Sequence, residues 1–140
     1  MRVRWLLLLP SFLAAFLVSA AVQAGELASW RFDAGLNRLL FSTRGGGVQP
    51  KAQLIFNPTR VVIDLQGISL ERKTANQKLR DGFREVRVGQ LDDRTTRIVV
   101  ELERGYMIDP KEVKFRGATA SQWTVDFPKP EQVESKKPND

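Results

Sequence analysis

The chain has 140 residues, with 22 Lys and Arg against 16 Asp and Glu and a formal net charge of +6 at pH 7. It contains no Cys and no His, which excludes disulfides, Ser–His or Cys–His nucleophile pairs and the commonest zinc ligands. The basic excess is mild and interspersed, so it favours an anionic partner surface and argues against nucleic acid.

The N-terminus has the pattern of a secretory signal peptide. Arg2 and Arg4 precede an apolar run from Trp5 to Val18, and Val22-Gln23-Ala24 then offers a site for signal peptidase. The apolar run is shorter than the roughly 20 residues that a bilayer crossing needs, which argues against an uncleaved anchor. We therefore expect residues 1–24 to be removed after Ala24. The exported remainder is long enough for one domain and has no membrane-spanning segment.

Four pairs of short segments with alternating apolar and polar residues follow, each pair joined by a turn. The pairs are 27–33 with 38–43, 52–56 with 60–65, 85–90 with 97–102, and 112–116 with 122–127. Period-2 alternation with β-branched and aromatic residues indicates half-buried strands, and the Gly, Asn, Asp and Pro between them indicate turns. The sequence therefore predicts four β-hairpins.

The connections between these pairs are polar. Arg44–Lys51 contains three consecutive glycines and predicts a flexible connection. Ile68–Gly82 lacks alternation, and we interpret it as a crossover loop with Lys73–Arg80 as a candidate helix. Tyr106–Asp109 is a candidate bridging strand that stops at Pro110. Pro128–Asp140 has three Pro, three Lys and a lone Val, so it predicts a disordered tail or linker.

An internal repeat relates these strands. Thr59–Leu65 and Thr96–Leu102 match in residue class at every position, and residues 37–41 and 123–127 are weaker copies. Repeated strands at short spacing without an amphipathic helix are typical of a β-sandwich. The predicted fold is all-β, with about eight strands and a pseudo-two-fold internal symmetry.

The polar rows of these strands carry arginines. Arg60, Arg87 and Arg97 all occupy outward positions, and a guanidinium group matches a carboxylate with two parallel hydrogen bonds. Such a face suits the carboxylate-bearing peptides of the bacterial cell wall. An equally weighted alternative is a solvated face on which Arg is neutralised by neighbouring Asp and Glu.

Two other chemical interpretations are less favoured. Asp64 and Glu101 are a candidate carboxylate pair for glycosidase chemistry, but cross-strand ion pairing explains their positions better. Trp30 and Trp123 are candidate sugar-stacking platforms, but each shares a strand face with other apolar residues, which favours core packing.

Three sequence blocks carry a family resemblance: Asn57–Leu65, Val86–Gln90 and Thr95–Leu102. Together with Phe32-Asp33 and Asn37-Arg38-Leu39, they occur in order within residues 31–127. In this order and spacing they resemble the AMIN domain, the non-catalytic N-terminal module of exported N-acetylmuramoyl-L-alanine amidases, and are most similar to the cyanobacterial type.

The resemblance implies that residues 25–127 form a β-sandwich of two roughly four-stranded sheets. It also implies peptidoglycan binding in the periplasm and the targeting of an attached or associated cell-wall amidase to the division septum. Arg60, Arg87, Gln90 and Arg97 lie at the signature positions and are the candidate ligand-binding residues. The zinc-binding amidase domain is absent from these residues, so we expect no catalytic residue, metal or cofactor.

Related modules occur in the secretins of type IV pilus systems, which leaves an alternative function open. In that alternative, the domain is a periplasmic adaptor that binds a secretin or divisome protein. Free edge strands would then pair with an extended segment of the partner.

Overall fold

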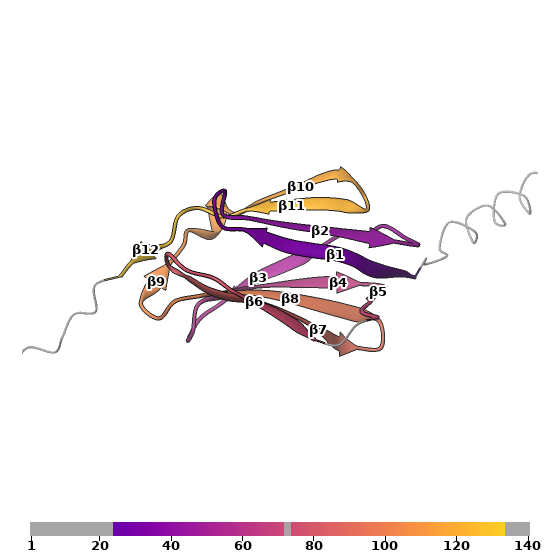
Figure 1. The fold of residues 1–140 in the computed structure, drawn as a ribbon, viewed down its shortest axis with the longest axis horizontal. Coiled ribbons are helices and arrows are strands. Elements are labelled where there is room, and N and C mark those ends of the chain that lie inside the picture. The colour runs from indigo at the N-terminus through magenta and orange to yellow at the C-terminus, as the bar shows by residue number, and fades with distance from the viewer. Residues whose placement is uncertain (1–23, 72–73, 134–140) are drawn as a thin grey trace, which may run out of the picture.

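A computed structural model of the chain describes residues 24–71 and 74–133 (Figure 1). Its elements are β1 (Gly25–Asp33), β2 (Arg38–Arg44), β3 (Lys51–Ile55), β4 (Arg60–Gln66), β5 (Ile68–Ser69), β6 (Ala75–Lys78), β7 (Phe83–Asp92), β8 (Thr95–Leu102), β9 (Tyr106–Met107), the 3₁₀ helix η1 (Pro110–Glu112), β10 (Lys114–Thr119), β11 (Gln122–Asp126) and β12 (Glu131–Gln132). The predicted signal peptide, apart from Ala24, lies outside the described residues.

The strands form two main sheets that lie face to face in Figure 1. Sheet A has the order β10-β11-β2-β1-β5, and sheet B has the order β3-β4-β8-β7-β6. A separate two-stranded pairing joins β9 to β12. The all-β prediction is therefore confirmed, although each sheet has five strands instead of about four. The extra strands, β5 and β6, come from the segment that was interpreted as a crossover loop.

All four predicted hairpins form, and their second strands meet at the centre of each sheet. In sheet A, β2 pairs with β11, and in sheet B, β4 pairs with β8. The two copies of the sequence repeat thus lie antiparallel to each other in the middle of sheet B. This arrangement gives each sheet an approximate two-fold axis between its central strands, as the internal repeat predicts.

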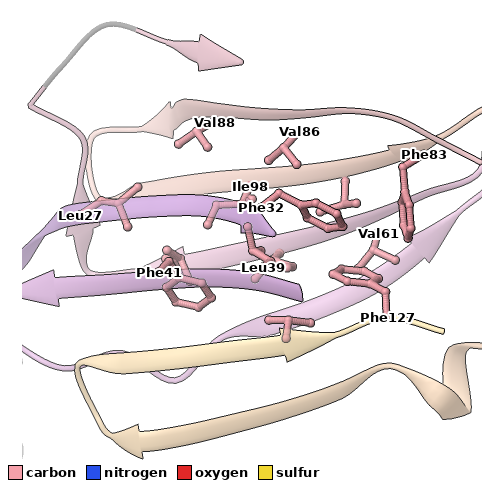
Figure 2. Packing of buried hydrophobic residues seen from close by; sticks show 14 of the residues in the cluster. Leu27, Phe32, Leu39, Phe41, Val61, Phe83, Val86, Val88, Ile98 and Phe127 are labelled. Carbon is pink, nitrogen blue, oxygen red and sulfur yellow. The ribbon is translucent and has the colours of Figure 1, made fainter. Parts of the chain in front are cut away.

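The core lies between the sheets and consists of the inward side chains of both (Figure 2). Leu39, Ile63 and Ile98 from the central strands have no exposed surface. Three phenylalanine rings join the sheets: the centroid of Phe32 lies 5.1 Å from that of Phe83 and 5.9 Å from that of Phe127. Burial of each such side chain contributes about 1.5–3 kcal/mol, so this layer supplies the main stabilisation of a domain without disulfides.

The helix proposed for Lys73–Arg80 is wrong, because Ala75–Lys78 forms strand β6 against β7. The extended backbone carries the Gln77 amide across the sandwich to the free edge of β1. The backbone N–H of Phe32 donates to Gln77 Oε1 at 3.2 Å, and Gln77 Nε2 donates to the Phe32 carbonyl at 3.1 Å. A half-buried strand edge needs such partners, and this requirement outweighs the weak helix preference of a short polar segment.

The predicted disordered tail also differs from the structure at its start. Glu131 and Gln132 form β12, which pairs with β9, the short strand predicted within Tyr106–Asp109. Pro130 is buried next to Gly82, where an added Cβ would lie 2.8 Å from the proline ring. Backbone pairing orders this segment up to residue 133, even though it buries little apolar surface. Residues 134–140 lie outside the described part of the chain.

Removing the Gln77 amide should destabilise the fold. We expect Gln77→Ala to lower the free energy of unfolding by about 1–3 kcal/mol, because the backbone N–H and carbonyl of Phe32 lose their partners. Urea denaturation measures this change. The exposed Gln53 of edge strand β3 provides a matched control, and Gln53→Ala should change stability by less than about 0.5 kcal/mol. Equal effects of the two substitutions would show that the cross-sandwich contact contributes nothing.

Candidate functional site

The outer face of sheet B carries the arginines that the sequence singled out. The strand register places its charged side chains on one surface: Lys51, Arg60, Asp64, Lys78, Glu85, Arg87, Arg97 and Glu101, with Arg84 bonded to Glu101 from the start of β7. Six of these are basic and three are acidic. The face therefore has a net positive charge even when every carboxylate is paired.

The sequence repeat explains how these charges are arranged. Each copy has an Arg near its start and an acid four residues later, and the two copies run antiparallel. The register therefore places Arg97 opposite Asp64 and Arg60 opposite Glu101. Arg97 donates from Nε to Asp64 Oδ1 at 2.7 Å and from Nη2 to Oδ2 at 3.0 Å. This two-point contact raises the pKa of Arg97, so its charge is permanent.

Glu101 lies beneath the arginines and has a side chain that is only 7% exposed. Arg87 Nη1 donates to Glu101 Oε1 at 3.0 Å and to Glu85 Oε1 at 2.8 Å. The hydrogen bond with Glu85 raises the pKa of Arg87 and lowers the pKa of the Glu85 carboxyl group. Arg60 lies opposite Glu101, but its Nη1 donates to the Pro58 carbonyl at 2.8 Å. These bonds fix the guanidinium groups in place.

The bonds within the fold do not use all of the guanidinium N–H donors of these arginines. Among the described residues, Arg60 and Arg87 each use Nη1 alone, and Arg97 uses Nε and Nη2. The side chain of Arg87 is 42% exposed and that of Arg97 is 33% exposed. The acids therefore orient the guanidinium groups, as the alternative of a charge-neutralised face predicts, and each group keeps N–H donors that these bonds do not use.

A depression of about 460 Å³ lies on this face beside Arg87 and Arg97. Gly89 lies in it, opposite Arg97 in register and two residues from Arg87 along β7. The absence of a side chain at Gly89 leaves the space open. An added Cβ would meet only Thr74 Cγ2, at 3.2 Å. Gly89 was not among the predicted site residues, although a glycine inside a strand often marks a close approach to another group.

Gln90 has a different environment from the three arginines. Its Oε1 accepts from the backbone N–H of Leu70 at 2.7 Å, and its Nε2 donates to the carbonyls of Asp92 and Thr95 at 2.6 and 3.0 Å. Gln90 lines the depression, but these bonds fasten the β5–β6 connection to the β7–β8 turn. The structure thus brings Arg87 and Arg97 together and places Arg60 across Glu101, while the Gln90 amide is used within the fold.

The two candidate glycosidase carboxylates, Asp64 and Glu101, are both held by arginines. Asp64 is bound by Arg97, and Glu101 accepts from Arg87 and lies 3.4 Å from Arg84 Nε. Neither is arranged as an acid with a free opposing base. Their geometry matches the interpretation as cross-strand ion pairs.

A second depression, of about 710 Å³, lies on sheet A and was not nominated from the sequence. Its lining includes Arg31, Arg116 and Leu40, together with Trp30 and Trp123, whose side chains pack partly against the core. Beside it, Arg38 and Arg116 both donate to Asp126, which lowers the pKa of that carboxyl group. The outer face of sheet A therefore carries a similar number of arginines and can serve as a control surface in binding experiments.

The fold defines the class of the protein as an all-β sandwich module with a cationic outer face on sheet B. The chain belongs to the AMIN domain family, which its sequence matches over residues 26–127. AMIN domains are non-catalytic modules of periplasmic proteins that bind peptidoglycan. No curated protein and no solved structure matches the chain. Over residues 24–71 and 74–133, no helix is long and apolar enough to cross a membrane.

The Glu85–Arg87 contact should make stability depend on acid pH. The folded-state pKa of Glu85 lies below its ordinary value of about 4.5, so its contribution is fully present above that pH. It is lost as the pH falls through the folded-state pKa. Thermal unfolding between about pH 6 and pH 3 should show a smaller acid-induced loss for Glu85→Gln than for the wild type. Parallel curves would contradict this role for Glu85.

Proposed function

We propose that this protein is a periplasmic peptidoglycan-binding module that localises an attached or associated cell-wall amidase to the division septum. The observation that carries the proposal is the AMIN match over residues 26–127. The export signal predicted at the N-terminus agrees with a periplasmic location. The amidase and the septum follow from the resemblance to the amidase N-terminal modules.

The outer face of sheet B is the proposed binding surface, with Arg60, Arg87 and Arg97 as the ligand-contacting residues. Peptidoglycan carries short peptides with free carboxylates, and the face has more basic than acidic groups. The acids Asp64 and Glu101 hold the guanidinium groups in place before binding, which reduces the entropy lost on binding. Gln90 contributes to the proposed site indirectly, because its hydrogen bonds hold the β7–β8 turn next to the site in place.

A second candidate function is the periplasmic adaptor, which one structural feature favours. Sheet A ends at β10 and sheet B ends at β3, and a small apolar depression between them is lined by Leu54, Val61 and Phe115, among others. An extended segment of a secretin or divisome protein would add to one of these edges. A pull-down from periplasm freed of sacculi tests this candidate.

Co-sedimentation with purified sacculi tests the main proposal. We expect the wild-type protein to pellet with sacculi at low salt and to be released as salt is raised, because the contacts are between exposed charges. The triple variant Arg60→Gln, Arg87→Gln, Arg97→Gln should bind at least about tenfold more weakly, given about 1.5–3 kcal/mol for a hydrogen bond to a charged group.

A matched triple variant separates site binding from general charge attraction. Arg31→Gln, Arg38→Gln, Arg116→Gln removes the same charge from sheet A and should leave binding within about twofold of the wild type, since loss of net charge alone acts weakly at a distance. Equal losses in the two variants would reject the assignment to sheet B. Wild-type protein that stays in the supernatant at low salt would reject peptidoglycan binding itself.

A further inference from the structure

A depression at Gly89 interrupts the charged outer face of sheet B. We propose that it binds a free carboxylate of a peptidoglycan stem peptide, held by Arg87 and Arg97, with the adjoining small side chain of the peptide over Gly89. This inference rests on the proposed function and names the part of the polymer that the module recognises. The peptide is read, and the sugar chain is not.

The arrangement of the two arginines favours a carboxylate. Arg97 is the register partner of Gly89, and Arg87 is its neighbour on the same face of β7, so the two guanidinium groups flank the depression. Their bonds to Asp64, Glu85 and Glu101 orient them and, within the described residues, leave Nη1 of Arg97 and Nη2 of Arg87 without a partner. Donors from two arginines that line one space suit the two oxygens of a carboxylate.

The remaining lining favours a peptide with small apolar side chains. Ala75, Val99 and Leu91 contribute apolar surface, and the Leu91 side chain is exposed although it is large. Asn76 Nδ2 donates to Glu85 at 3.3 Å, which leaves its carbonyl oxygen able to accept from a peptide N–H. An alanine-like residue next to a carboxylate satisfies both the apolar and the polar parts of this lining.

The depression at Gly89 does not suit sugar rings. Its lining contains no aromatic side chain, and Trp30 and Trp123 both belong to sheet A. Stacking on an aromatic ring is a common way to hold a sugar, and carboxylate recognition does not require it. In an intact wall strand the lactyl carboxyl group of the glycan is joined to the peptide, so the free carboxylates belong to the peptides.

Gly89 allows the space to be filled without straining the backbone. Its φ lies outside the left-handed region, and the only close neighbour of an added Cβ is the methyl end of the Thr74 side chain. Gly89→Ala should therefore fold and reduce the space, and Gly89→Val should fill it. Gly35→Val is the matched control. Gly35 is an exposed residue of the β1–β2 turn, and its φ also lies outside the left-handed region.

The test measures binding of the full chain to three probes by isothermal titration calorimetry. These are a synthetic stem tetrapeptide with free carboxylates, the same peptide with every carboxylate amidated, and soluble glycan chains stripped of peptide. We expect the wild type to bind the free peptide at least about tenfold more tightly than either other probe, as loss of a charge-assisted contact predicts. Gly89→Val should lose at least about tenfold in affinity for the free peptide, and Gly89→Ala should lose less, while Gly35→Val should match the wild type.

The outcomes separate this inference from the proposed function. If the wild type pellets with sacculi but binds the amidated peptide or the bare glycan as well as the free peptide, the inference is overturned and peptidoglycan binding stands. If Gly89→Val binds the free peptide normally, the depression is not the site. If the wild type does not pellet with sacculi, both proposals fail. The comparison of the three probes uses the wild type, so it does not depend on the folding of any variant.

Discussion

The antiparallel pairing of β4 with β8 determines both surfaces of sheet B at once. The same register that sends Ile63 and Ile98 into the core sends the Arg97–Asp64 pair to the outside. Because side chains alternate along a strand, a slip of one residue would bury the charges and expose the core. The apolar layer therefore fixes the register of β4 and β8. The same register determines where the charged side chains lie on the outer face.

Alternation along single strands made much of this fold predictable from the sequence. It predicted the four hairpins, the all-β class and the outward positions of Arg60, Arg87 and Arg97. The order of strands across a sheet was not predictable in the same way, because alternation says nothing about which hairpin lies beside which. That order places β8 beside β4 and so brings Asp64 to Arg97. The choice of ion-pair partners therefore required the structure.

Residues that act through a single tertiary contact left little signal in the sequence. Gln77 stands in a short polar segment without periodicity, and its role depends on the distant edge of β1. The role proposed for Gly89 depends on two arginines that line the same depression, and only the structure places them there. The pairing of Glu131 and Gln132 with β9 uses backbone groups, which every residue except proline offers equally.

The position of the tryptophans has a practical consequence for spectroscopy. Apart from Trp5, which precedes the described residues, both indoles belong to sheet A, in register on either side of Phe41. Both side chains pack partly against the core, and Trp30 also lines a depression together with Ala75, at the edge of sheet B. Intrinsic fluorescence in this domain consequently follows the integrity of the packed interior.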